Sequence, residues 1–309
     1  MGIMRSMFLA ASENGWLKER APRLRFVRRT VSRFMPGEDL EDALAAAGDL
    51  KRQSIGTILT QLGENVTDAS EASAVRNHYL HALERVRELC LDAEVSLKLT
   101  HLGLDVDRNL CFEHLASIVD AAGKDNLVWI DMEASCYVDR TLELYRQVRQ
   151  SYANVGVCLQ AYLYRTAADL AALTPAGPAI RLVKGAYNEP ADRAFPKKKD
   201  VDENYFELAK QLLSPRARQQ GMRAALATHD RRLINRIISF AESGDLPVNA
   251  FEFQMLYGIE RAEQLRLAQE GRRLRVLISY GDFWFPWFMR RLAERPANAA
   301  FVLRNLLAS

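Results

Sequence analysis

Short apolar runs of strand length alternate with longer, more polar stretches through most of the chain. The runs are rich in aliphatic residues, and the stretches between them are long enough for helices. Two of these stretches, residues 70–90 and 139–152, carry apolar residues at helical spacing. Eight runs are candidate strands: Ile55–Leu62, Val95–Thr100, Leu127–Met132, Gly156–Tyr162, Ile180–Ala186, Ala224–Thr228, Phe251–Leu256 and Leu274–Ser279.

This alternation predicts βαβ units and a parallel sheet. Eight units favour a closed (βα)8 barrel of the TIM type over an open, doubly wound sheet of five or six strands. We therefore expect an α/β fold with two parts. Residues 1–54 would form an N-terminal helical arm, with a turn at Pro36–Asp39 and an amphipathic helix directly after it, and residues 55–309 would form the barrel.

Composition and charge narrow the function. The formal net charge is only +3, which argues against nucleic acid as the main partner. No stretch is long and apolar enough to span a membrane, and the N-terminus is too broken for a signal peptide. We expect a cytoplasmic protein. The basic run Arg23–Arg33 fits a solvated helix face, and peripheral contact with the inner face of the plasma membrane is the alternative left open.

Metal and nucleotide motifs are missing from the sequence. The four cysteines lie far apart without a CxxC grouping, so we expect them reduced, mostly buried and without zinc. His78 and His81 are three apart on a predicted helix, but no acidic partner is placed, and we predict no metal site. Neither a GxGxxG after a strand nor a GxxxxGK[ST] occurs, so a Rossmann or P-loop site is not indicated.

Polar residues recur late in the predicted strands, where a parallel barrel builds its active site. They are Lys98, Asp131, Glu133, Gln160, Arg181, Lys184, Thr228, His229, Glu252 and Gln254. Strands covered on both faces should be apolar, so these residues need partners or a ligand. A polar ligand site is favoured over an ion-pair network. Two alternatives stay open for single residues: a Schiff base at Lys98 or Lys184, and a cofactor contact or general base at His229.

The segment from residue 280 combines an aromatic cluster with a helix that carries Arg290, Arg291 and Glu294. Two guanidinium groups suit a substrate carboxylate, because each offers a planar pair of donors. A solvated surface helix is the alternative. It is disfavoured by the five aromatic residues between positions 283 and 288, which are unlike a fully exposed segment.

The strand ends together resemble the proline dehydrogenase family over most of the chain. The matching pieces, in the family's order, are LGE (62–64), SLKLTHLG (96–103), IDMEAS (130–135), LQAYL (159–163), RLVKGAY (181–187), ATHD (227–230), FEFQML (251–256) and YGDFW with RRLAERPAN (280–298). RLVKGAY and the RRLAER helix are the most specific. The chain length is similar to that of the bacterial monofunctional enzymes.

The resemblance implies a distorted (βα)8 barrel with FAD at its mouth, which oxidises L-proline to 1-pyrroline-5-carboxylate and passes electrons to a quinone. Asp131 and Arg181 would be catalytic, with Asp131 orienting Lys98 and Arg181 near the reactive flavin nitrogen. The proline site would comprise Lys98, Tyr187, Leu256, Leu277, Arg290, Arg291 and Glu294, the last of these pairing with an arginine. The FAD site would comprise Met132, Gln160, Arg181, Lys184, Gly185, Ala186, Thr228, His229 and Gln254.

Two positions depart from the family's pattern. Leu277 stands where the family usually has a tyrosine, and Trp287 stands where another aromatic residue, usually tyrosine, is expected. The hydroxyproline type of the family has a small polar residue at the first position, so the apolar Leu277 favours proline. Hydroxyproline oxidation, a flavin-free Schiff-base lyase and a non-catalytic binding barrel remain the alternatives.

Overall fold

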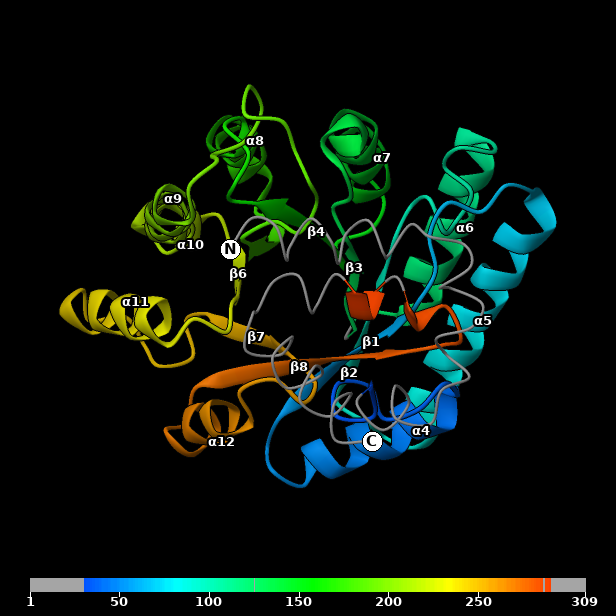
Figure 1. Cartoon of the computed structure of the whole chain (residues 1–309), viewed down its shortest axis with the longest axis horizontal. Coiled ribbons are helices and arrows are strands. Elements are labelled where there is room, and N and C mark those ends of the chain that lie inside the picture. The colour runs from blue at the N-terminus through cyan, green and yellow to red at the C-terminus, as the bar shows by residue number, and fades with distance from the viewer. Residues whose placement is uncertain (1–30, 125, 286, 290–309) are drawn as a thin grey trace, which may run out of the picture.

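The computed structural model describes residues 31–124, 126–285 and 287–289. Eight parallel strands close into a barrel in chain order, and each lies where the sequence predicts one (Figure 1). Their bounds are β1 Gly56–Gln61, β2 Ala93–Leu97, β3 Val128–Ile130, β4 Val155–Gln160, β5 Ala179–Val183, β6 Arg223–Ala227, β7 Glu252–Leu256 and β8 Arg273–Tyr280. The predicted α/β barrel is confirmed.

Helices surround the strands as an outer ring (Figure 1). After successive strands come α5 Ala69–Glu88, α6 Arg108–Ala122, α7 Val138–Arg149, α8 Thr166–Leu173, α9 Lys198–Leu212 with α10 Pro215–Gln219, α11 Arg231–Ser243 and α12 Arg261–Gln269. Short 3-10 turns, η2 Ser135–Tyr137 and η3 Thr174–Ala176, precede α7 and follow α8. Acidic side chains accept hydrogen bonds from the first turns of α5, α6 and α11 at Asp68, Asp107 and Asp230, which explains where these helices begin.

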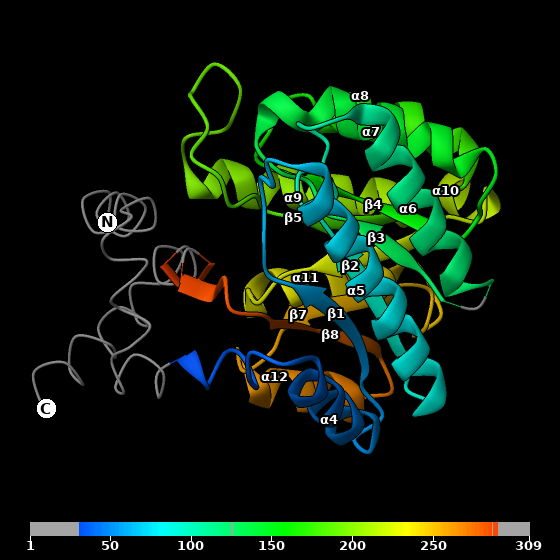
Figure 2. The same ribbon diagram turned by 90° about the vertical axis from the view of Figure 1, so that its right-hand side faces the viewer.

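The ring is irregular where the barrel closes. Helix α4 (Leu40–Lys51), which precedes the first strand, packs against both β1 and β8. The chain after β8 instead continues beyond the carboxyl ends of the strands (Figure 2, orange). A helix from the start of the chain therefore covers the seam that a helix following β8 would cover in a regular barrel.

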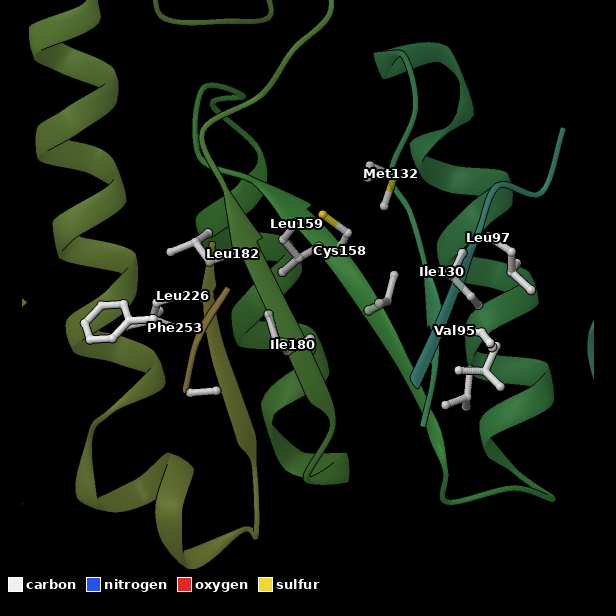
Figure 3. Packing of buried hydrophobic residues seen from close by; sticks show 14 of the residues in the cluster. Val95, Leu97, Ile130, Met132, Cys158, Leu159, Ile180, Leu182, Leu226 and Phe253 are labelled. Carbon is white, nitrogen blue, oxygen red and sulfur yellow. The ribbon is translucent and has the colours of Figure 1, made fainter. Parts of the chain in front are cut away.

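Two environments alternate along the strands. Outward-facing residues such as Val95, Ile130 and Leu182 are buried against the helices (Figure 3). Inward-facing positions carry several polar residues, among them Glu94, Ser96 and Arg181, although they too are buried. Because successive residues of a strand face opposite sides, the polar set lines the interior of the barrel.

A second apolar cluster lies apart from this core and joins the two ends of the described chain. It contains Val31, Phe34 and Met35 with Trp284, Phe285, Trp287 and Phe288, next to Leu62 and Ile259. The Phe34 and Phe288 ring centroids are 6.1 Å apart, and Trp284 Nε1 donates to Glu38 Oε1 at 2.9 Å. As expected, most of this aromatic segment is buried, with the exception of Phe283, which is 42% exposed.

All four cysteines are free. Cys111 and Cys158 are buried, whereas Cys90 and Cys136 are exposed, so the expectation of mostly buried cysteines is wrong for half of them. His78 Nε2 lies 2.8 Å from the hydroxyl of Tyr280, across α5 and β8. Among the described residues no group of three or more His, Cys, Asp or Glu could hold a metal ion.

Candidate active site

Arg181, in the middle of β5, points into the barrel and is only 3% exposed. Its Nε donates to Gln254 Oε1 at 2.6 Å, and its Nη1 donates to Asp131 Oδ1 at 2.6 Å and to Ser96 Oγ at 2.8 Å. The guanidinium carbon lies 4.6 Å from the centre of the Trp129 ring. The ring of Trp129 therefore covers one face of the guanidinium group. Gln254 binds Nε, and Ser96 with Asp131 binds Nη1.

The third nitrogen of the guanidinium group, Nη2, differs from the other two in its hydrogen bonding. Arg181 Nη2 is buried and has no hydrogen-bond partner among the described residues. Gln160, at the end of β4, has the complementary feature, because its Oε1 is a buried acceptor without a partner in the same part of the chain. Its Nε2 donates to the carbonyl groups of Met132 and Glu133 at 3.2 and 3.1 Å. Buried polar atoms are rarely left unpaired, so both atoms indicate a polar ligand.

Asp131 and Lys98 extend this arrangement toward the mouth of the barrel, the end where the strands terminate. Ser96 Oγ donates to Asp131 Oδ1 at 2.9 Å while it accepts from Arg181. Asp131 thus pairs with Arg181, and its role toward Lys98 stays a prediction. Lys98 is half-buried and follows the last residue of β2 directly.

Lys184 leaves β5 and lies between two carboxylates. Its Nζ is 2.5 Å from Asp202 Oδ1 and 3.0 Å from Asp230 Oδ2, and Lys198 contacts the same two residues. Partial burial alone would raise the pKa of Asp230, but the hydrogen bonds and charges of Lys184 and Lys198 hold it well below its usual range. Because this amine already pairs with two carboxylates, a Schiff base at Lys184 is disfavoured.

The loop after Lys184 turns sharply. Gly185 has φ +116°, and a Cβ atom there would lie 2.2 Å from the ring of Tyr162, so only glycine fits. Ala186 and Tyr187 follow and are half-buried. Farther along, Glu189 accepts hydrogen bonds from the backbone N–H and the hydroxyl of Ser135, which ties this loop to η2 at the end of β3.

Strands β6 and β7 contribute a second edge of the mouth. The backbone N–H of Leu256 donates to His229 Nε2 at 2.8 Å, so this nitrogen is the unprotonated one in that contact. The backbone N–H of Thr228 donates to the carbonyl of Gln254 at 3.2 Å. Thr228 and His229, the two residues after β6 that are predicted for the FAD site, therefore both lie beside β7.

Two leucines, on β7 and β8, form an apolar part of the candidate site. Leu256 and Leu277 are register partners on β7 and β8, and both are half-buried. Leu256 packs against the aromatic cluster that contains Trp284 and Phe288, whereas Leu277 packs against Ile58 and Trp129 in the barrel interior. Arg290, Arg291 and Glu294 lie outside the described residues.

Two of the strand-end residues do not face this site. Glu133 accepts from the backbone N–H and the hydroxyl of Thr100 at 3.2 and 2.6 Å, and burial raises its pKa. It joins the segments that follow β2 and β3. Glu252 is the first residue of β7 and lies one inward-facing position below Gln254, at the opposite end of the strand. The expectation that it lies at the mouth is wrong.

Two members of the site were not singled out from the sequence, namely Ser96 and Trp129. Each stands two residues before a predicted site residue, Ser96 before Lys98 and Trp129 before Asp131. Because side chains two apart on a strand share a face, this spacing is the signal that could have found them.

Comparison with known proteins gives a consistent result. A family model described as "Proline dehydrogenase" matches residues 43–304. "Proline dehydrogenase 1" of Bacillus subtilis subsp. natto is 41% identical over 307 residues, which is 99% of each chain. "Proline dehydrogenase" of Deinococcus radiodurans is 39% identical over 283 residues, or 90% of each chain.

The fold also matches solved structures. The crystal structure of proline utilization A (PutA) from Bdellovibrio bacteriovorus superposes with a TM-score of 0.81 at 23% identity, over 94% of this chain and 36% of that one. At this identity the similarity concerns the barrel alone. The family model and the two relatives near 40% identity confirm the family that the motifs predict: the chain belongs to the proline dehydrogenase family.

Proposed function

We propose that this protein oxidises L-proline to 1-pyrroline-5-carboxylate, with FAD bound at the barrel mouth. The activity follows from membership of the proline dehydrogenase family, which is generally flavin-dependent. The observation that carries the FAD assignment is the pair of unsatisfied buried atoms, Arg181 Nη2 and Gln160 Oε1. They offer one donor and one acceptor, which fits a flat heteroaromatic ring with both kinds of atom on its edges.

Proline would lose a hydride from the ring carbon next to nitrogen and a proton from the nitrogen, so that a C=N bond forms. Bound FAD would supply the hydride acceptor. Lys98, with Arg290 and Arg291, would bind the carboxylate, and Glu294 would pair with an arginine. Arg181, held by Asp131, would place its free Nη2 against the reactive edge of the ring.

The other assigned residues shape the site. Leu256, Leu277 and Tyr187 would enclose the proline ring and exclude water. The remaining FAD contacts would come from the segments after β3, β4, β5, β6 and β7: Met132, Gln160, Lys184, Gly185, Ala186, Thr228, His229 and Gln254. Gly185 allows the sharp turn against the ring of Tyr162, after which Ala186 and Tyr187 follow in the loop.

Electron acceptor and location complete the proposal. A quinone would reoxidise the cofactor, and the protein would work in the cytoplasm; peripheral contact at the inner face of the plasma membrane is the alternative. No helix in the described part of the chain is both long enough and apolar enough to cross a bilayer. No nucleic acid partner is proposed.

The test is spectroscopic. The purified full-length chain, incubated with FAD and desalted, should keep the absorbance of oxidised flavin, and adding L-proline under anaerobic conditions should bleach it. A colourless protein after this treatment would contradict the flavin assignment. Bleaching by 4-hydroxyproline in preference to proline would contradict the substrate.

Borohydride trapping separates the Schiff-base alternative. Covalent labelling of Lys98 or Lys184 by a carbonyl substrate would support that alternative, and we expect none, since Lys184 is paired with Asp202 and Asp230.

A further inference from the structure

The floor of the barrel, at the amino ends of the strands, contains a cluster of two buried glutamates and two partly buried arginines that the proposed reaction does not use. It consists of Glu94, Arg223, Glu252 and Arg275 from β2, β6, β7 and β8. Arg223 is 2.6 Å from Glu94 and 2.8 Å from Glu252, and Arg275 Nε is 3.3 and 3.6 Å from the same two carboxylates. Burial alone would lower the pKa of Arg223, but Glu252 and Glu94 raise it above its usual value.

Gln254 connects this floor cluster to the site above. Its Nε2 donates to Glu252 Oε1 at 2.6 Å, and its Oε1 accepts from Arg181 Nε at 2.6 Å. A carboxylate paired with arginines only accepts hydrogen bonds, and a guanidinium group only donates them. An amide placed between these two groups has a single orientation that satisfies both. Glu252 therefore fixes which atom Gln254 presents to Arg181.

The orientation of Gln254 in turn affects Arg181 Nη2, the nitrogen without a partner among the described residues. Gln254 holds Nε, while Ser96 and Asp131 hold Nη1. With Trp129 against the face of the group, Nη2 is the remaining nitrogen and has one position. If the amide of Gln254 turned over, its NH₂ would face Arg181 Nε, and that side of the clamp would become repulsive.

We propose that Glu252 is a positioning residue for the reaction: through Gln254 it fixes the guanidinium group of Arg181 against the flavin ring. The inference rests on the proposed function, since it concerns the group that would face the cofactor. Glu252 itself is 2% exposed at the floor, where its side chain contacts Gln254, Arg223 and Arg275.

Glu94 provides a matched control. It is buried, it pairs with the same two arginines, and it also accepts from Trp129 Nε1 at 2.7 Å. Its hydrogen bonds and ion pairs do not include Gln254, and in Glu94→Gln the amide oxygen can still accept from Trp129 Nε1, so the ring against Arg181 stays in place. Replacing either glutamate by glutamine removes one carboxylate from the floor cluster, so both variants should lose comparable thermal stability. Only Glu252→Gln frees the amide of Gln254, because glutamine both donates and accepts.

The first measurement is made without FAD. Hydrogen exchange of the Arg181 Nε–H, followed by side-chain ¹⁵N NMR on the full chain, reports the contact with Gln254 directly. We expect exchange at least tenfold faster in Glu252→Gln than in the parent, and parent-like protection in Glu94→Gln. Equal exchange in the two variants would overturn the proposal, whether or not the protein binds FAD.

The second measurement uses the FAD-loaded protein. A fixed guanidinium group favours the reduced cofactor, which gains negative charge. In Glu252→Gln we expect the ratio of reduced to oxidised FAD at a fixed potential to fall by about tenfold, a shift of about 30 mV for two electrons. Glu94→Gln should titrate like the parent. The same shift in both variants would reduce Glu252 to a structural role.

A third variant keeps the test possible if Glu252→Gln does not fold. Glu252→Asp keeps a carboxylate near the two arginines but is one methylene too short to hold Gln254 in the same place. It should reproduce the faster exchange and the lower potential, and parent-like values for both would contradict the proposal. A parent protein that takes up no FAD would contradict the proposed function, while the exchange measurement would still decide this inference.

Discussion

Burying a guanidinium group is costly unless its N–H groups find partners. Arg181 has partners from three strands for Nε and Nη1, and Nη2 is left without one among the described residues. An arginine held so completely on one side has little freedom to move, and its remaining donors are prepared for a ligand. Residue chemistry and strand register together therefore determine what this position can bind.

Replacing Arg181 by lysine tests this directly. Lysine keeps the charge but cannot bond Gln254 and Asp131 at once, because it lacks the planar fork. We expect kcat/KM for proline to fall by on the order of 30- to 100-fold, equivalent to about 2–3 kcal/mol for hydrogen bonds to a charged group. Arg165→Lys is the control, since Arg165 pairs with Asp139 and Asp169 outside the site. A similar loss in both variants would contradict the role of Arg181.

Asp230 gives a prediction about pH. Its folded pKa lies below the unfolded value of about 3.9. Its ion pairs with Lys184 and Lys198 therefore contribute full stability above about pH 4, and this contribution is lost as the pH falls through the folded pKa. Asp230→Asn keeps an N-cap for α11 but not the charge. Urea unfolding should show a loss on the order of 2 kcal/mol at pH 7, shrinking below pH 4. A constant difference between pH 7 and pH 2.5 would refute this.

Several residues of the buried polar arrangement could be predicted, because polar groups within buried parallel strands are conspicuous. Arg181, Gln160 and Gln254 belong to this group, and all three are buried. Their hydrogen-bond partners could not be predicted, because a partner depends on the register between strands. Glu252 shows the limit: it lies two residues from Gln254, yet this step along a strand moves it from the site to the floor cluster.

For the helices and strands, too, the sequence predicts some features and not others. All eight strands were predicted from short apolar runs, and the errors lie at their ends. The predicted run Ile180–Ala186 becomes β5 Ala179–Val183, because Lys184 turns toward Asp202 and Gly185 takes φ +116°. The position of α4 could not be predicted, since an amphipathic pattern shows that a helix has a buried face but not which strands cover it.

Glycines at the close contacts between elements allow a quantitative test. Gly258, after β7, has φ +73°, and a Cβ atom there would lie 1.6 Å from the carbonyl oxygen of Arg33. Gly271 has the same φ, but a Cβ atom there would meet nothing within 4 Å. Gly271→Ala should therefore cost only the backbone strain, about 1–2 kcal/mol. Gly258→Ala should cost more, because it also displaces the segment around Phe34 that packs on the aromatic cluster.

Urea unfolding of the two variants measures this difference, and the near-ultraviolet signal of the buried tryptophans reports the cluster itself. We expect Gly258→Ala to change that signal and Gly271→Ala to leave it unchanged. Equal destabilisation with unchanged spectra would mean that residues 31–35 do not depend on the turn at Gly258.

Over the whole molecule, the seam between β8 and β1 decides how the barrel closes. Helix α4 covers this seam, and six of its residues, including Leu44, are buried in the same core as the strands. The division of the chain at residue 54 separates an arm from a barrel along the sequence. Energetically, however, a helix whose apolar face belongs to the barrel core should unfold together with the barrel.

Leu44→Ala tests whether it does. Leu44 is 2% exposed, and truncating a buried leucine costs about 2–5 kcal/mol through lost burial and the cavity left behind. We expect the urea midpoint of the entire transition to fall, with far-ultraviolet circular dichroism and tryptophan fluorescence still coincident. Leu89→Ala, at a leucine that is 44% exposed, should change little. An early, separate transition in Leu44→Ala that left the barrel signal at the parent midpoint would show that α4 is an independent unit. Coincident transitions at a lower midpoint would instead mean that α4 and the barrel unfold as one cooperative unit, so that the stability of the seam between β8 and β1 depends on a helix that precedes both strands in the chain.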